Sequence, residues 1–375
     1  MNWFKEFPHY VWPIATFATG LAAWFGAMLL VLTKSLYFRD SITTSNVVQR
    51  VHVEPTPRIG GLALYFSVLL GTVLSTGESR HFLMYLVMAG TPAFAFGLLE
   101  DCTHRVPVVT RLFATLGSGI LGCFITGSTI TGIDVPLIDT LLMWAPLSVV
   151  FTAFAVSGVA NAFNIIDGFN GLASGTAMIA LWAMGLVGLH LGDVQLVNVC
   201  VILAAAITGF LLVNWPFGKL FMGDGGAYFV GFAVAWVAVL LLEHHPEVSA
   251  WCPLLICAYP VLEVVFSMRR RRLRNQIVGH ADRLHLHSLV KRRVVRQLFP
   301  RVNRTLRNSI TGALLWAMTL LPSVWAVLLY DDTPQLMLGL VAFALAYHVL
   351  YVRLVRFGWH LRRPAGPPPV AHSSK

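Results

Sequence analysis

Residues 11–33 read VWPIATFATGLAAWFGAMLLVLT, a run without a charged side chain that is long enough to cross a lipid bilayer as a helix. It is too long for the apolar core of a secretory signal and has no small-residue cleavage site, so we interpret it as a first membrane span. Similar runs recur along the chain of 375 residues, of which 57% are hydrophobic and only 12% are charged. Because soluble domains usually hold about 25% charged residues, this composition predicts a polytopic membrane protein.

At about 20 apolar residues per span, the chain has room for eleven spans and for no separate soluble domain. The expected spans are residues 11–33, 59–76, 82–99, 112–128, 141–159, 172–190, 197–214, 227–243, 250–267, 309–330 and 335–352. We therefore expect an all-α fold, with one transmembrane domain over residues 1–353 and a basic, proline-rich tail over residues 354–375. The loops expected to carry the site are residues 34–58, 100–111, 160–171, 215–226 and 268–308.

Basic residues are distributed unequally between the two sets of loops. Of the 27 Lys and Arg, 25 fall on one side, and only Lys5 and Arg80 fall on the other. Short positively charged loops are retained in the cytoplasm, so the N-terminus is expected outside, with the C-terminus and all the polar clusters inside. Much of the net charge of +10 lies in residues 269–307, which can meet anionic lipids. No nucleic-acid partner is needed to explain this charge.

The polar cluster NAFNIIDGFNGLA, residues 161–173, carries most of the functional information. Asn161, Asn164, Asp167 and Asn170 recur every three residues, so on a helical turn they would form one polar face. Carboxylates and carboxamides are costly in a membrane segment, and such a face could bind a metal ion, a sugar or a uracil amide. Hydrogen bonding between helices is the alternative explanation.

Two further clusters flank the second and third expected spans. In EPTPRIGG, residues 54–61, prolines hold the chain extended and Arg58 would face an anion; the alternative is a rigid loop. Glu100 and Asp101 end the third span as adjacent carboxylates, which repel each other unless they share a cation or a proton. A solvated helix end is the alternative for this pair.

The last two clusters suit phosphate chemistry. Asp224 stands among three glycines in the sequence GDGG, where a carboxylate suits magnesium bound together with phosphate oxygens; a tight turn is the alternative. The sequence DRLHLHS, residues 282–288, offers Arg283, His285 and His287 as cationic phosphate donors, or is an ordinary basic loop. No cysteine or carboxylate completes a zinc set beside these histidines.

Taken in this order, the motifs resemble those of the polyprenyl-phosphate N-acetylhexosamine-1-phosphate transferases, of glycosyltransferase family 4 type. The sequence PTPRIGG is closer to the glycan-initiating branch, which includes undecaprenyl-phosphate GlcNAc-1-phosphate transferases, than to the phospho-MurNAc-pentapeptide transferase branch. Four positions depart from the family pattern. In this chain, Glu100 stands where the family usually has the first aspartate of a pair, and His104 stands where it often has an acidic residue. Ala227 stands where serine is usual, and Ser288 stands where a further histidine is common.

The resemblance implies a magnesium-dependent phosphotransferase of the bacterial cytoplasmic (inner) membrane. It would transfer a phospho-N-acetylhexosamine from a UDP-sugar to undecaprenyl phosphate, giving undecaprenyl-diphospho-sugar and UMP. Such a step initiates a cell-surface glycan such as the O-antigen of lipopolysaccharide. The resemblance also allows Mn²⁺ in place of Mg²⁺ and a homodimer. Because the second pKa of a phosphate monoester is about 6, the acceptor is already largely dianionic, so a strong general base is not compulsory.

We accordingly expect Asp224, with Asn164 and Asp167, to bind the metal. Asp101 and Glu100 would orient or deprotonate the lipid phosphate, with Asp167 as a third catalytic residue. The residues expected to bind substrate are Arg58, Asn161, Asn164, Asn170, Arg283, His285 and His287. The competing functions are a secondary transporter with intramembrane acidic residues, which would need acids throughout the membrane depth, and a non-catalytic scaffold for glycan assembly.

Overall fold

The computed structural model describes residues 14–37, 56–273 and 284–356, and over these residues the regular structure is helical throughout. Nine of the described helices are long and apolar enough to cross a membrane. They are α2 (Ile14–Leu32), α5 (Gly77–Thr103), α6 (Val108–Thr126), α8 (Ala145–Ile166), α9 (Leu172–His190), α10 (Val194–Asn214), α11 (Gly223–His244), α16 (Arg304–Leu328) and α17 (Thr333–Arg356). The chain is therefore an all-α, multi-pass membrane protein, as its composition predicts.

The two remaining expected spans are also helical but shorter. Residues 59–76 form α4 (Gly60–Leu74), and residues 250–267 form α12 (Trp251–Ile256) and the start of α13 (Ala258–Leu273). Pro260 lies in the first turn of α13, where its missing N–H costs no helical hydrogen bond, so a new helix can begin there. The expectation of eleven spans stays a prediction.

The other helices are short and lie outside the long bundle helices. They are α3 (Lys34–Tyr37), α7 (Pro136–Leu142), α14 (Leu286–Val290), the π-helical turn η2 (Lys291–Val295) and α15 (Arg296–Leu298).

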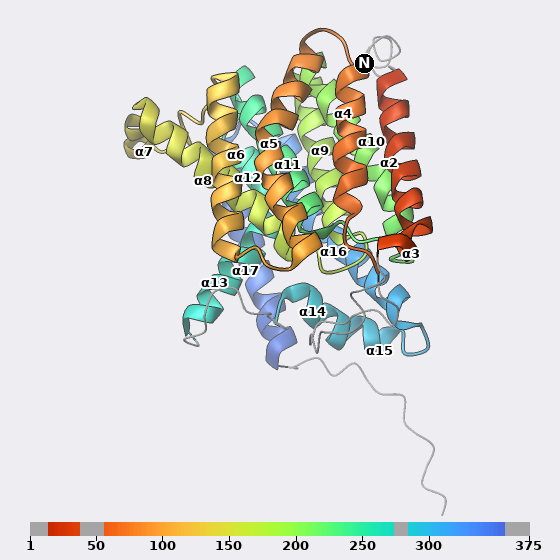
Figure 1. Cartoon of the computed structure of the whole chain (residues 1–375). Helices are drawn as coiled ribbons and strands as arrows, with labels where there is room; N and C mark the ends of the chain where they lie inside the picture. The colour runs from red at the N-terminus through yellow and green to blue at the C-terminus, as the bar shows by residue number, and fades with distance from the viewer. Residues whose placement is uncertain (1–13, 38–55, 274–283, 357–375) are drawn as a thin grey trace, which may run out of the picture.

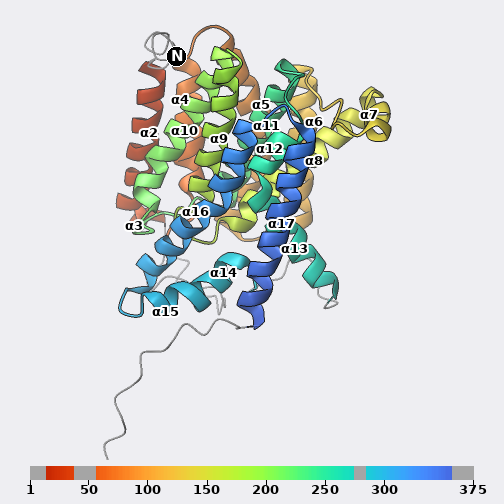
Figure 2. The same ribbon diagram turned by 180° about the vertical axis from the view of Figure 1, so that it is seen from behind.

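Helix α11 forms the centre of the bundle. It is apolar around its whole circumference and almost entirely buried, as expected of a helix that has no face toward solvent or lipid. It packs against α4, α5, α8 and α9, while α2 and α10 lie on one flank and α6 on the other (Figure 1). Figure 2 shows α16 and α17 on the opposite side of the bundle.

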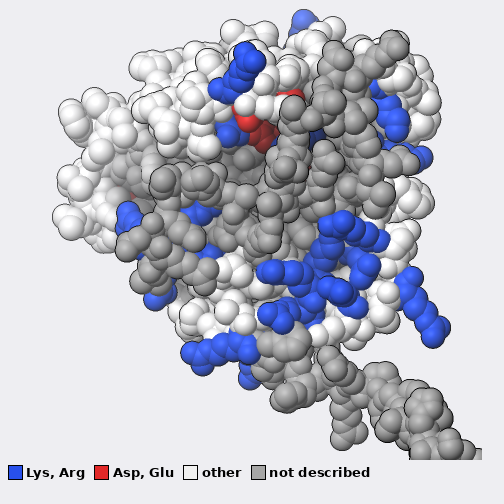
Figure 3. All heavy atoms as spheres, turned by 60° about the horizontal axis from the view of Figure 1, so that its bottom comes forward, with Lys and Arg blue, Asp and Glu red and all other residues white. Residues whose placement is uncertain are grey.

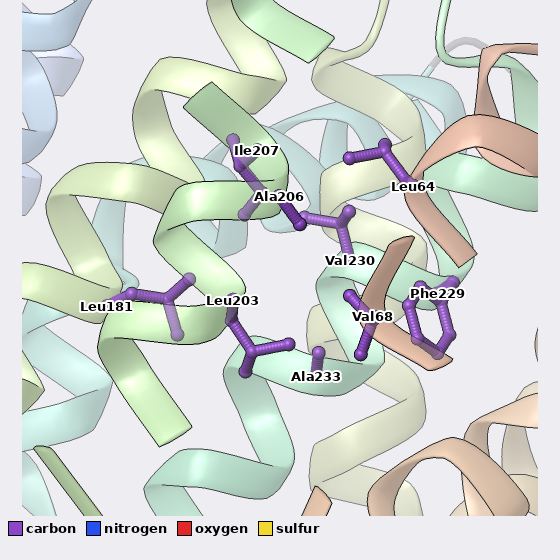
Figure 4. Close-up of a pocket in the computed structure, with 9 residues that line it drawn as sticks. All are labelled: Leu64, Val68, Leu181, Leu203, Ala206, Ile207, Phe229, Val230 and Ala233. Atoms are coloured by element: carbon purple, nitrogen blue, oxygen red, sulfur yellow. The ribbon is translucent and has the colours of Figure 1, made fainter. Parts of the chain in front are cut away.

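The packing between α4, α9, α10 and α11 leaves a small apolar cavity (Figure 4). Its lining consists of Leu64, Val68, Leu181, Leu203, Ala206, Ile207, Phe229, Val230 and Ala233. These side chains have no polar atom that could bind a phosphate or a metal ion, so the cavity belongs to the membrane core and not to a functional site.

The polar loops converge at one end of the bundle, where α14, η2 and α15 form an additional layer (Figure 1). Figure 3 shows this end, with acidic side chains beside Lys and Arg and further basic side chains nearby. Helix α2 begins at the opposite end of the bundle (Figure 1).

Candidate active site

The carboxylate of Asp224, in the first turn of α11, is the point at which four elements meet. Its Oδ1 accepts a hydrogen bond from Asn164 of α8 at 3.1 Å and lies 3.5 Å from the Arg58 guanidinium, which precedes α4. Its Oδ2 pairs with the Arg111 guanidinium of α6. Asp224 is only 8% exposed. Its buried negative charge is therefore stabilised by the two guanidinium groups and by the Asn164 amide.

Asp101 fixes the backbone beneath Asp224. Its Oδ1 accepts the Asp224 N–H and its Oδ2 accepts the Gly225 N–H, each at 2.9 Å. These are first-turn amides of α11, which have no partner within their own helix and favour a negative charge beside them. Asp101 therefore joins the end of α5 to the start of α11.

The glycines around Asp224 allow close packing of backbone. Gly223 has a left-handed φ of 76°, and a Cβ there would clash with the Arg58 carbonyl and lie 2.5 Å from Asp101 Oδ2. A Cβ on Gly226 would lie 2.8 Å from the Gly61 Cα, where α4 and α11 touch. Close packing between the helices is therefore a sufficient reason for these glycines.

The segment that carries Arg58 is held against residues 221–222 by backbone hydrogen bonds. The Phe221 N–H donates to the Pro57 carbonyl at 2.8 Å, and the Gly61 N–H donates to the Met222 carbonyl at 2.8 Å. Two motifs that are far apart in the sequence are joined in this way, and the Arg58 side chain is brought to Asp224.

The expectation of one helical face over residues 161–170 is wrong beyond Ile166. Helix α8 ends there, Asp167 is its C-cap, and Gly171 turns the chain with a φ of 74°. The polar residues after Ile166 therefore lie in a turn and not on the face of α8.

Asn161 and Asn170 are not brought to Asp224. Asn161 donates to the Thr115 hydroxyl at 3.0 Å and so joins α8 to α6. Asn170 is fully buried and donates to the Ser309 hydroxyl of α16 at 3.0 Å. The Asn161 contact is the hydrogen bonding between helices that the sequence left open as an alternative, and the Asn170 contact joins the turn after α8 to α16.

Asp167, by contrast, shares the electrostatic environment of Asp224. Burial raises the pKa of Asp167 well above its usual range, and Asp224 and Asp101 raise it further, against the Arg58 guanidinium and the Gly223 N–H. Carboxylates crowded in this way become ionised together when a cation lies among them. Asp224, Asp167 and Asn164 supply carboxylate and amide oxygens, the ligand type that a hard divalent cation prefers.

The histidine motif is held by a carboxylate that the sequence analysis overlooked. Glu263 of α13 is 1% exposed; its Oε1 accepts from His285 Nδ1 at 2.9 Å and from the Leu286 N–H at 3.0 Å. Its Oε2 accepts from the Tyr347 hydroxyl at 2.9 Å. A histidine that donates through Nδ1 has its Nε2 directed to another partner. A lone glutamate inside an expected span was a signal for this role.

The histidines lie against the turn that follows α8. The rings of His285 and His287 stack with their centroids 5.1 Å apart, and His287 lies 4.9 Å from the Phe169 ring. The Lys291 ammonium lies 5.4 Å from the same ring. Burial, together with two nearby arginines, lowers the pKa of Lys291 to about 8. Arg283 lies outside the described residues.

Glu100 and Asp101 point to different partners. Glu100 accepts the Val106 N–H at 2.8 Å and holds the turn after α5, in which His104 has a φ of 54°. Adjacent positions on a helix do not face each other, so the two carboxylates diverge. The expectation that they share one cation is not supported by these contacts.

Arg111 is a site residue that the sequence analysis counted only toward the charge bias. Its side chain is 13% exposed and pairs with Asp224. A signal was present, because Arg111 stands at the mouth of a span, shortly after the acidic pair that required a cation.

Residues 83–242 match the sequence profile of glycosyl transferase family 4. A probable undecaprenyl-phosphate N-acetylglucosaminyl 1-phosphate transferase of Bacillus subtilis (strain 168) is 29% identical over 241 residues, which are 64% of this chain and 66% of that protein. The undecaprenyl-phosphate alpha-N-acetylglucosaminyl 1-phosphate transferase of Yersinia pestis is 26% identical over 72% of this chain and 74% of its own. The protein of the same description from Escherichia coli (strain K12) is 26% identical over 90% of both chains.

Proposed function

We propose that this chain is a member of glycosyl transferase family 4 and that it transfers N-acetylhexosamine 1-phosphate from a UDP-sugar to undecaprenyl phosphate. N-acetylglucosamine is the sugar in the descriptions of the relatives and is the first donor to test. An acceptor phosphate oxygen forms a bond to the sugar-bearing phosphorus, the bond from that phosphorus to the bridging oxygen breaks, and UMP leaves. The product would begin a cell-surface glycan such as the O-antigen.

The observation that carries this proposal is the convergence of cations and carboxylates on Asp224. Phosphoryl transfer between two anions needs positive charge fixed where negative charge develops. The Arg111 side chain is 13% exposed and pairs with Asp224, whereas the Arg58 side chain, which also contacts Asp224, is 55% exposed and can meet a substrate phosphate. A binding or scaffold protein would not need such a buried arrangement of opposite charges.

We propose Mg²⁺ as the divalent cation, with Mn²⁺ as a substitute, held by Asp224, Asp167 and the amide oxygen of Asn164. When bound, the ion neutralises oxygens of the donor diphosphate. Asp101 would hold the first turn of α11, and with it Asp224, in place beside the acceptor phosphate at the end of α5, and its carboxylate would contact that phosphate by taking up a proton from it. Glu100 shapes the turn beside it.

The histidine motif is proposed to hold the phosphates of the donor. His285 is oriented by Glu263 and has its Nε2 available, while His287 and Lys291 line the same turn beside Phe169. Arg283 precedes these residues in sequence and is proposed to act with them.

The site lies at one end of the membrane helices, which suits two substrates of opposite solubility. A UDP-sugar can arrive from water, and the phosphate of a lipid can arrive from the surface of the bilayer. We propose the bacterial inner membrane, with this end in the cytoplasm, where the Lys and Arg seen in Figure 3 would also meet anionic lipids.

The test is a reconstitution of the reaction. Purified protein would be given undecaprenyl phosphate, Mg²⁺ and a panel of UDP-N-acetyl sugars, with the lipid product identified by mass and UMP by chromatography. We expect UMP and undecaprenyl-diphospho-sugar in equal amounts. Folded protein that gives neither product with any donor would overturn the proposal.

A further inference from the structure

A second polar cluster lies at the end of the bundle opposite Asp224. Asp193 ends the turn between α9 and α10, and His244 and His245 stand where α11 ends. The Asp193 Oδ2 atom lies 2.8 Å from His244 Nδ1 and 3.1 Å from His245 Nε2. These three ligand atoms all lie within 4.8 Å of one another.

The spacing of these atoms is close to that of a metal site. Zinc–nitrogen bonds of about 2.0 Å in a tetrahedron place neighbouring ligand atoms about 3.3 Å apart. The two contacts to Asp193 would therefore lengthen only slightly to admit an ion. Two imidazoles and one carboxylate suit Zn²⁺ and similar transition metals better than Mg²⁺, which prefers oxygen ligands.

Two of the three side chains are already oriented for binding an ion. Asp193 Oδ1 accepts the Leu196 N–H at 2.8 Å as the N-cap of α10, which leaves Oδ2 for the histidines. His245 has its other nitrogen, Nδ1, 3.4 Å from a carboxylate oxygen of Glu247. A carboxylate behind the distal nitrogen of a histidine is a common feature of metal ligands.

The third side chain is also fixed, and the cluster remains open to solvent. The His244 ring packs against the Phe82 ring with centroids 5.1 Å apart. The side chains of His244, His245 and Asp193 are 27%, 13% and 10% exposed to solvent. An ion can reach them from the aqueous side, and a water molecule can complete the coordination.

We propose that Asp193, His244 and His245 bind one divalent transition metal ion of the zinc type. The ion would tie the turn between α9 and α10 to the C-terminal end of α11. Asp224 and His244 stand at opposite ends of α11, about 30 Å apart at about 1.5 Å per residue, so this ion is distinct from the proposed catalytic cation.

The test measures Zn²⁺ bound to the purified full-length protein in nanodiscs, after dialysis against Mg²⁺ buffer with and without Zn²⁺. We expect the wild type to retain one equivalent of Zn²⁺ more than the His244→Ala/His245→Ala double variant, and Zn²⁺ to raise the melting temperature of the wild type but not of the double variant. His81→Ala is the matched control, because His81 is an exposed histidine at the same end outside the cluster. It should behave as the wild type does.

A second variant guards against misfolding. Asp193→Asn keeps an oxygen to cap α10 but removes the charged ligand, so it should fold and still lose the additional Zn²⁺. Equal Zn²⁺ content in the wild type and Asp193→Asn, or a melting temperature raised equally in both, would overturn the proposal. Neither readout depends on transferase activity, which the double variant should retain.

Discussion

The structure makes a sharp distinction between the neighbouring residues Asp101 and Glu100. Both oxygens of Asp101 accept a backbone N–H of α11 at 2.9 Å. In Asp101→Asn, one oxygen becomes an NH₂ group, which cannot accept, so the N–H of Asp224 or Gly225 would lose its partner. In Glu100→Gln, the remaining oxygen can still accept the single Val106 N–H.

The magnitude follows from these contacts. A buried N–H without a partner costs about 1–3 kcal/mol, and removing a negative charge from a helix N-terminus costs about 0.3–1 kcal/mol. If the first turn of α11 must be held in place during the reaction, Asp101→Asn lowers the rate by about tenfold to several hundredfold. Glu100→Gln should lower it by less than about threefold, a cost below about 0.7 kcal/mol.

The assay is single-turnover transfer at matched UDP-sugar occupancy, with the melting temperature of each variant measured alongside. Donor binding should change little in either variant. Equal losses would show that the two carboxylates act together, and a larger loss for Glu100→Gln would refute the reasoning from hydrogen bonds.

Three further predictions concern residues around the site. Arg111→Met should reduce single-turnover transfer by more than about a hundredfold, because the buried Asp224 carboxylate would then have one cation fewer beside it. Arg111→Lys keeps the positive charge and should recover part of the rate. Equal activity of the Met and Lys variants would contradict a role for the charge of Arg111. Glu263→Leu should reduce donor affinity measured by calorimetry, because leucine has no oxygen to accept from His285 Nδ1 and fix the ring. Unchanged affinity would speak against this role. The pKa of Lys291 is lowered to about 8, so its positive charge is present below that pH and lost above it. Donor affinity should accordingly fall as pH rises through about 8, and in Lys291→Arg the fall should occur at a higher pH. Isothermal titration of the donor at several pH values tests both expectations, and an affinity that does not change with pH would refute them.

The fold could be predicted from the sequence because apolar runs of membrane length have few alternatives in lipid. The short length of α4 and the break between α12 and α13 could not be predicted, because hydropathy alone does not show where a helix begins or ends. The expected face over residues 161–170 failed for the same reason: the spacing fits a helix, but α8 ends at Ile166 and Gly171 turns the chain into α9.

The candidate site was predicted where polar residues form a local motif. Asn164 and Asp224 stand out in the sequence, and the structure brings them together with Arg58. Arg111 and Glu263 were missed because each stands alone in its segment, and only the tertiary fold supplies the partner that explains the charge. Asn161 and Asn170 look identical in sequence to Asn164, yet they face other helices.

The central claim is that Asp224 anchors the reaction centre of a phospho-sugar transferase, and one comparison tests it most directly. Transfer from UDP-N-acetylglucosamine to undecaprenyl phosphate would be measured at saturating Mg²⁺ for the wild type, Asp224→Asn and Asp331→Asn, an identical change at an exposed acid at the other end of the bundle. We predict that Asp224→Asn abolishes release of UMP in a protein that remains folded, while Asp331→Asn retains wild-type turnover. Normal turnover by Asp224→Asn would contradict the account.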